Sequence, residues 1–146
     1  MARPETAQPV TGHKAVPKPT PETRPYWDGA AAGELLMQYC LSCAEHYFPP
    51  RSFCPLCLGL DFEWRRMSGR GRLHSYLINQ SFAPPGWEVP YAIALVELEE
   101  GPRMMSNILG VPPDPEHLVL DMELEVTFEQ RGDMTLPQFR PVGGTA

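Results

Sequence analysis

Apolar and polar residues alternate most regularly in the segment 122–129, near the C-terminal end of the chain. Met122, Leu124 and Val126 stand at every second position, and the residues between them are polar, beginning with Glu123 and Glu125. Successive side chains of a strand point to opposite faces, so a period of two predicts a strand with one buried face and one solvent face.

Four other segments have the composition of strands. The segment 90–98 is nearly continuously apolar, which predicts a strand covered on both faces. The expected strands are 73–82, 90–98, 103–109, 122–129 and 135–140, with one helical turn within 112–118. Five strands and one short helical insertion predict a mainly β unit, a five-stranded Greek-key barrel of the OB type. A β-sandwich normally needs more strands and more chain.

The first half of the chain follows a different pattern. Residues 20–36 predict a helix, with Pro25 in its first turn and Gly33 at its end. Tyr26 and Trp27 are large for a surface helix, so we expect them to pack against the body of the protein. Strands are expected at 35–39 and 62–67, on either side of the cysteine-containing segment. The predicted domains are 22–67, a helix with a ribbon, and 68–142, the OB-fold barrel.

Residues 1–21 differ from both predicted domains. They contain five prolines and little that a core could bury, so they are expected to form a disordered tail or an arm that lies along a partner. The two lysines of the chain, Lys14 and Lys18, both lie here. The predicted folded part therefore lacks a lysine that could form a Schiff base, and arginine is its only fixed cation.

The four cysteines of the chain form two Cys-x2-Cys pairs, Cys40 with Cys43 and Cys54 with Cys57, with ten residues between the pairs. Two such turns facing each other place four thiolates around one metal ion, so we predict one structural zinc in a rubredoxin-like ribbon. Four thiolates leave no open coordination position for hydrolytic chemistry. Two disulfides, or iron in place of zinc, are the alternatives.

Charge and hydropathy narrow the possible functions. Residues 69–146 carry five basic and eleven acidic side chains, and this segment holds the whole net charge of −6. Such a barrel would repel a phosphate backbone, which argues against the nucleic-acid-binding role that zinc ribbons and OB folds often have. No stretch approaches the ~20 apolar residues of a membrane-spanning helix. No signal peptide is recognised, so disulfides are disfavoured and a cytoplasmic protein without a membrane partner is expected.

Several motifs occur in an order that identifies a family. They are Pro-Tyr-Trp at 25–27, Cys-Leu-Ser-Cys at 40–43, Tyr-Phe-Pro-Pro-Arg at 47–51, Cys-Pro-Leu-Cys at 54–57, Ser-Gly-Arg-Gly at 68–71, Pro-Tyr-Ala-Ile-Ala-Leu-Val-Glu-Leu at 90–98, Glu-Gly-Pro-Arg-Met-Met-Ser-Asn at 100–107 and Thr-Leu-Pro-Gln-Phe-Arg-Pro at 135–141. Over residues 21–142 the chain closely resembles the zinc-ribbon and OB-fold family long catalogued as a domain of unknown function. One departure is Asp121, where many members have glycine.

The resemblance implies a role as an accessory subunit. Members of that family typically accompany thiolase-superfamily enzymes, including ketothiolases, acyltransferases and lipid-transfer-type aldolases that act on acyl-CoA. The small protein docks on the enzyme and helps to hold or enclose the coenzyme A arm. By this resemblance the expected partners are such an enzyme, in a hetero-oligomer, and its acyl-CoA substrate. The enzyme's task would belong to steroid or other lipid side-chain metabolism.

The residues themselves favour binding over catalysis. The four histidines are scattered along the chain, and no Gly-x-Ser-x-Gly, His-Glu-x-x-His or phosphate-loop motif occurs. Coenzyme A calls for arginines at its phosphates, an aromatic plane at adenine and an apolar channel for its arm. The candidate substrate or partner contacts are Arg70, Arg72, Phe82, Trp87 and Tyr91. A plain strand entry at 70–72, and a nucleic-acid-binding module overall, remain the alternatives.

Overall fold

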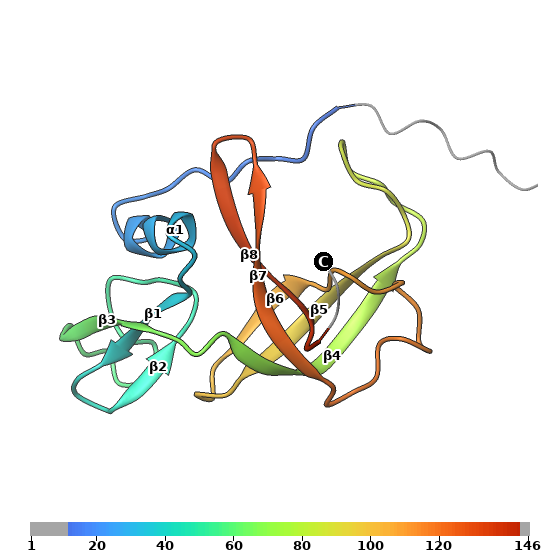
Figure 1. Ribbon diagram of the computed structural model, residues 1–146. Helices are drawn as coiled ribbons and strands as arrows, with labels where there is room; N and C mark the ends of the chain where they lie inside the picture. The colour runs from blue at the N-terminus through green and yellow to red at the C-terminus, as the bar shows by residue number, and fades with distance from the viewer. Residues whose placement is uncertain (1–11, 144–146) are drawn as a thin grey trace, which may run out of the picture.

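The structure is a computed structural model that describes residues 12–143. One short helix precedes two β-sheets (Figure 1). The elements are α1 (Arg24–Ala31), β1 (Leu36–Cys40), β2 (Glu45–Tyr47), β3 (Phe62–Arg66), β4 (Arg70–Asn79), β5 (Tyr91–Leu98), β6 (Arg103–Asn107), β7 (Glu123–Arg131) and β8 (Met134–Pro141). The first three strands form one sheet and the other five form a second sheet. The mainly β prediction is confirmed.

Helix α1 is shorter than the predicted 20–36. Thr23 is its N-cap and Pro25 lies in its first turn, as expected. Gly33 follows the end of the helix with φ +76°, a left-handed conformation that glycine adopts without steric cost. Leu36 already belongs to β1, because the chain reverses at Gly33 to pair with β3.

The smaller sheet has the strand order β2-β1-β3, and both pairings are antiparallel. The buried Gln38 of β1 holds the following loop in place by its side chain. Its amide nitrogen donates to the carbonyl oxygen of Arg51 at 2.7 Å, and its amide oxygen accepts the Arg51 N–H at 2.8 Å. The side chain thereby satisfies both backbone groups of Arg51, as a neighbouring strand would.

The larger sheet has the strand order β6-β5-β4-β7-β8. A parallel bridge between Ile108, just after β6, and Phe139 of β8 brings the two edges of the sheet together. The pairing of β4 with β5 shifts register between Leu73 and Ser75, a bulge of the kind that bends a strand around a barrel. These features match the predicted five-stranded OB-fold barrel.

One detail of the barrel differs from the sequence predictions and one agrees with them. Burial alternates strictly along β5, so that Ala92 is buried and Ile93 is half-buried. The expectation that both faces of this strand are covered is therefore wrong. The predicted helical turn within 112–118 is present: the Asp114 carbonyl oxygen accepts the N–H groups of His117 and Leu118, and Pro115 stands in the first turn, where no N–H donor is needed.

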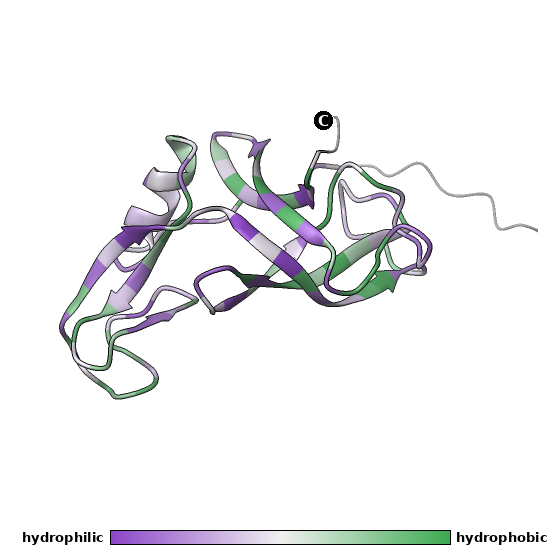
Figure 2. Ribbon diagram, turned by 60° about the horizontal axis from the view of Figure 1, so that its bottom comes forward, coloured by the Kyte–Doolittle hydropathy of each residue, from purple (hydrophilic) through white to green (hydrophobic). Residues whose placement is uncertain are grey.

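One hydrophobic core spans the helix, the start of β1 and the barrel. Tyr26 of α1 and Met37 of β1 are buried in the same cluster as Leu124 and Phe139 of the barrel. Helix α1 lies against β8, so it joins the ribbon to the barrel (Figures 1 and 2). Tyr26 thus packs against the body of the protein as predicted, and Trp27 packs against the edge of this core.

Asp121, the departure noted in the sequence, lies in the turn before β7 with φ +66°. We expect Asp121→Val to lower the free energy of unfolding by about 1–2 kcal/mol, because a β-branched residue strongly disfavours the left-handed region. The free energy of unfolding of Asp121→Gly should equal or exceed that of the wild type. Urea denaturation of the three proteins tests this expectation, and equal stability of the Val variant and the wild type would contradict it.

Candidate metal centre and ligand pockets

The four cysteine sulfur atoms converge at one point of the ribbon, and all lie within 4.8 Å of one another. The Cys40 and Cys57 sulfurs are 3.5 Å apart, and those of Cys43 and Cys54 are 3.7 Å apart. A tetrahedral zinc with Zn–S bonds of about 2.3 Å requires sulfur separations of about 3.8 Å. All four cysteines are free thiols, so the predicted cluster has formed and the disulfide alternative does not describe it.

Both cysteine turns have the same backbone conformation. In each turn the carbonyl oxygen of the first cysteine accepts the N–H of the residue four positions later, at 2.9 Å. That residue is Ala44 in the first turn and Leu58 in the second, with φ +59° and +62°. The Leu56 N–H also points at the Cys54 sulfur, at 3.4 Å. The backbone conformation of the two turns is therefore enough to direct the thiols toward one another, without contacts from side chains outside the cluster.

The surroundings of the thiols suit a cation. The Cys43 N–H lowers the pKa of Cys40 to about 6, whereas burial raises the pKa of Cys43 to about 12. Four ionised thiolates this close together repel one another unless a positive ion lies between them. The donor set, its spacing and its N–H···S contacts therefore fit one tetrahedral zinc with no vacant coordination position.

The loops around the cluster expose apolar side chains at the free end of the ribbon, which we call the ribbon tip. Green colouring marks these loops in Figure 2. The exposed tip residues are Leu41, Phe53, Leu56, Leu58 and Leu60. Residues 52–60 contain no charged side chain. The sequence reasoning missed this surface, although leucines inside tight cysteine turns are too constrained to reach a core.

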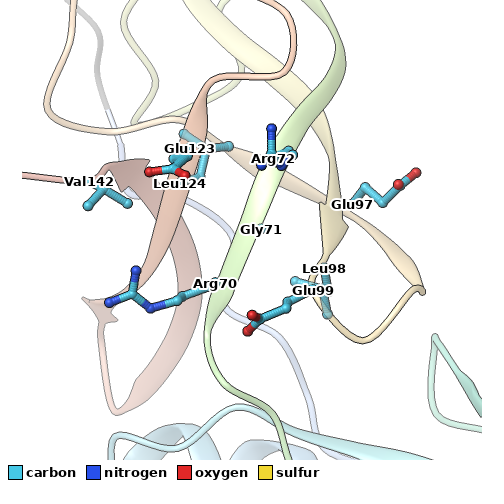
Figure 3. A pocket seen from close by; sticks show the side chains of 9 residues that line it. All are labelled: Arg70, Gly71, Arg72, Glu97, Leu98, Glu99, Glu123, Leu124 and Val142. Carbon is cyan, nitrogen blue, oxygen red and sulfur yellow. The ribbon is translucent and has the colours of Figure 1, made fainter.

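The predicted arginines Arg70 and Arg72 line a pocket of about 350 Å³ on β4 (Figure 3). Within the described residues, neither guanidinium forms an ion pair or a hydrogen bond. Glu97, Glu99 and Glu123 also line the pocket, and the Glu97 carboxylate is paired with Arg103 at 2.9 Å. Phosphate binding here would have to overcome this negative charge.

Gly71, between the two arginines, is required by packing. A Cβ atom at this position would lie 2.7 Å from the Glu97 carbonyl oxygen on β5. A real Cβ does not approach backbone that closely, so β4 needs glycine here whether or not a ligand binds. This observation favours the strand-entry interpretation of the Gly-Arg-Gly sequence.

Trp87 and Tyr91 come together on another side of the barrel. Their ring centroids are 4.5 Å apart, and both rings line an aromatic pocket of about 350 Å³ between α1, β5 and β8. Tyr26, Trp27 and Arg131 also line this aromatic pocket. The side chain of Phe82 is 68% exposed and lines neither of the two pockets described so far. The structure therefore separates the five candidate contacts into three places.

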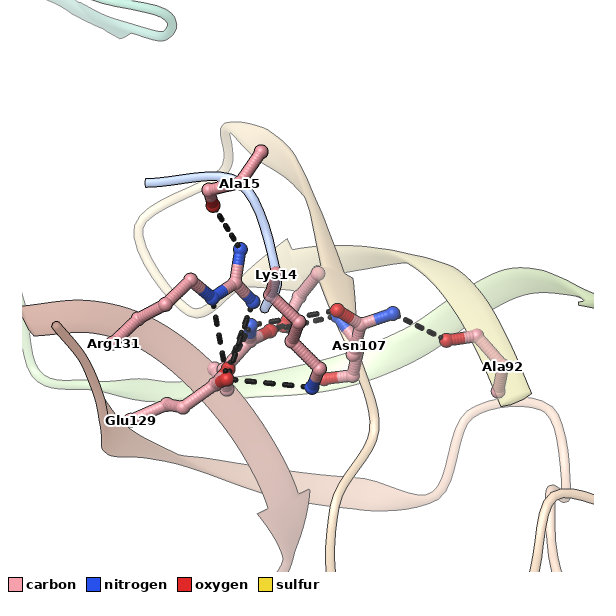
Figure 4. Close-up of polar contacts among 8 residues, drawn as sticks. Lys14, Ala15, Ala92, Asn107, Glu129 and Arg131 are labelled. Atoms are coloured by element: carbon pink, nitrogen blue, oxygen red, sulfur yellow. Dashed lines mark hydrogen bonds and ion pairs between the residues drawn. The ribbon is translucent and has the colours of Figure 1, made fainter. Parts of the chain in front are cut away.

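A polar network that the sequence did not reveal borders the aromatic pocket (Figure 4). Glu129 lies at its centre and contacts Lys14 at 3.4 Å, Arg131 at 3.1 Å and the Gln138 amide at 2.9 Å. Burial raises the pKa of Glu129, but the Gln138 hydrogen bond and the two cations outweigh burial and keep the pKa below its usual value. Gln138 also accepts the Asn107 N–H, which links β8 to β6.

Comparison with known proteins assigns both parts of the chain. Residues 27–63 match the family described as the rubredoxin-like zinc ribbon domain of ChsH2, and residues 64–129 match the C-terminal OB-fold domain of ChsH2. The chain belongs to the ChsH2/DUF35 family. The resemblance found in the sequence motifs is thereby confirmed.

The named relatives include an enzyme subunit and a scaffold protein. The chain is 34% identical to a probable enoyl-CoA hydratase alpha subunit of Thermomonospora curvata, over 80% of this chain and 36% of that protein. It is 37% identical to a DUF35 domain-containing scaffold protein of Methanocaldococcus jannaschii, over 62% of this chain and 64% of the relative. The chain thus spans about a third of the first relative and less than two thirds of the second.

A solved structure extends the likeness to three dimensions. The Ltp2-ChsH2(DUF35) aldolase contains a chain that matches with a TM-score of 0.77 and 30% identity, over 86% of this chain and 98% of that chain. The ribbon and barrel of the ChsH2/DUF35 family therefore occur here in the same arrangement. No helix within residues 12–143 is long and apolar enough to cross a membrane.

Proposed function

We propose that the chain is a non-catalytic accessory subunit that docks on a thiolase-superfamily or lipid-transfer-type aldolase enzyme and helps to position its acyl-CoA substrate. The observation that carries the docking role is the ribbon tip, where the loops around the metal centre expose five apolar side chains. Exposed apolar groups gathered on a rigid element are typical of protein interfaces. The family's aldolase complex supports an enzyme as the partner.

The positions of the reactive groups support the non-catalytic part of this proposal. The four cysteines, which are all that the chain has, converge on the metal centre, so none is available as a thiolase-type nucleophile. His46 packs on Tyr39, whereas the His117 Nδ1 lies 2.6 Å from the Asp114 carboxylate. Within residues 12–143 the histidines are dispersed, and none pairs with a cysteine.

The metal in this proposal is one structural zinc held by Cys40, Cys43, Cys54 and Cys57. It supplies no chemistry to a substrate, because all four positions are taken by thiolates. Its contribution is to fix the two cysteine turns against each other. The apolar groups that the ribbon buries around the cysteines are few, chiefly Tyr47 and Phe62, so the ribbon depends on the metal for its stability.

We expect Cys40→Ser to release zinc and unfold the ribbon, because structural zinc binding is coupled to folding. The metal content of the purified protein and its thermal melt check this expectation. Finding iron in the wild-type protein, or an unchanged melt in the variant, would refute the structural zinc. Arg51→Ser serves as the control, since this side chain is exposed and outside the ligand set.

The docking role predicts which proteins co-purify with the chain. A tagged chain isolated from the organism that encodes it should bring down an enzyme that acts on acyl-CoA. The double variant Leu56→Ser/Leu58→Ser should weaken that complex at least about tenfold, as loss of an interface anchor does. The matched control is Leu77→Ser/Leu120→Ser, which changes leucines of similar exposure, 55% and 58%, on the barrel.

Three results would count against docking through the ribbon tip. Recovery of the tagged chain alone would contradict docking, and recovery with RNA would favour the nucleic-acid-binding alternative. Equal losses in the tip and barrel double variants would show that exposed leucines matter in general and that the tip has no special part.

Substrate positioning is best supported at the aromatic pocket. Its walls carry four aromatic rings, a lining that suits the apolar arm and the adenine ring of coenzyme A, and its cation, Arg131, is already paired with Glu129. The pocket of Arg70 and Arg72 places these two cations beside the carboxylates of Glu99 and Glu123 and offers no aromatic ring. We therefore assign the acyl-CoA contact to Trp87 and Tyr91 in preference to the two arginines.

This assignment predicts different acyl-CoA affinities for variants at the two pockets. Trp87→Ala should weaken acyl-CoA binding to the assembled complex about tenfold, because the loss of a buried aromatic contact is worth about 1–3 kcal/mol. Phe82→Ala, an aromatic deletion in the same loop, and Arg72→Ala should leave the affinity within about threefold of wild type. Isothermal titration of the complex with acyl-CoA measures all three. A larger effect at Arg72 than at Trp87 would reverse the assignment.

A further inference from the structure

The segment before α1 lies on the barrel of its own chain. Residues 12–19, which we call the strap, pass the β7–β8 hairpin and the loop that carries Trp87 (Figures 1 and 4). The closest approach is at Gly86, where an added Cβ atom would lie 2.3 Å from the Lys14 backbone nitrogen. Only glycine permits this contact, so the loop and the strap fit each other at backbone level.

Lys14 connects the strap to two groups of the barrel. Its ammonium nitrogen lies 4.2 Å from the centroid of the Trp87 ring and 3.4 Å from a carboxylate oxygen of Glu129. A cation over an indole face and beside a carboxylate is held by both interactions. Lys18, the other lysine of the strap, is exposed and makes neither contact.

Arg131 holds the same ring and the same strap by a second set of contacts. Its guanidinium carbon lies 5.5 Å from the Trp87 centroid. The guanidinium also donates to the Ala15 carbonyl oxygen at 3.3 Å and pairs with Glu129. Trp87 therefore has two cations within reach of its ring, and one of the two comes from the strap.

Trp87 and Tyr91 form a wall between two cavities. The aromatic pocket of about 350 Å³ uses both rings, and so does a neighbouring cavity of about 240 Å³. Lys14 and Glu129 line the neighbouring cavity, whereas Arg131 lines the aromatic pocket. The strap thus supplies one boundary of the smaller cavity.

We propose that the strap is a latch on Trp87. While Lys14 is seated between Trp87 and Glu129, the indole ring keeps the two cavities apart. When the strap leaves, the ring loses one of its two cations and its loop loses the backbone contact at Gly86, so the ring is free to turn and the cavities join. The latch belongs to the free chain and does not depend on the proposed docking or acyl-CoA contact.

The matched pair Lys14→Ala and Lys18→Ala tests the latch. The chain contains three tryptophans, Trp27, Trp64 and Trp87, so labelling with 5-fluorotryptophan gives three fluorine resonances. The Trp87 resonance is identified by its loss in Trp87→Phe. We expect Lys14→Ala to shift and broaden this resonance, and Lys18→Ala to leave it as in the wild type.

The Trp64 resonance is the control for the fold. The Trp64 signal should be unchanged in both lysine variants, which shows that the fold is intact. Raising the salt concentration should move the wild-type Trp87 signal toward that of Lys14→Ala, because the Lys14–Glu129 pair is partly exposed and therefore screened. An unchanged Trp87 signal in Lys14→Ala, or equal changes in both lysine variants, would overturn the latch.

Discussion

The convergence of four thiols is the constraint on which the ribbon depends. The three-stranded sheet is small, and its local apolar cluster consists mainly of the cysteines themselves with two aromatic rings. A unit with so little to bury is held by a metal more readily than by a core. The two cysteine turns then have little conformational freedom left. Their outward side chains are consequently displayed on a rigid support.

The shared core makes the ribbon and the barrel act as one body. Tyr26, Leu35 and Met37 enter the same cluster as the barrel residues, and α1 lies against β8. A hinge between the two family domains would have to open this core, which opposes independent motion. The ribbon tip and the aromatic pocket therefore keep a fixed separation. A partner bound at the tip would meet the pocket in a defined orientation.

Local patterns predicted the fold and the metal centre well. Alternation along 122–129 and the Cys-x2-Cys spacing depend on neighbours in sequence, and both the strand and the cysteine cluster were confirmed. The predicted solvent face of that strand is exposed only at Glu123, because residues 125–129 are half-buried on both faces. The helix stop at Gly33 was predicted correctly, but the limits 20–36 were too wide, because Leu36 pairs with β3 as part of β1. The arrangement around Trp87 could not be predicted from the sequence, because Lys14 and Glu129 are 115 positions apart. Phe82 and Trp87 likewise differ in their surroundings, which composition does not encode.

The bidentate contact of Gln38 involves the backbone of Arg51 and leaves its side chain free. The backbone of Arg51 is fixed by two hydrogen bonds, whereas its side chain is exposed. The identity of the residue at position 51 is therefore unimportant to the contact, provided that it has an N–H. A cysteine-free attachment chemistry at this position, such as an unnatural amino acid that carries a spin label, would report distances from a backbone that two hydrogen bonds hold. Few exposed positions on so small a ribbon offer both an anchored main chain and a free side chain.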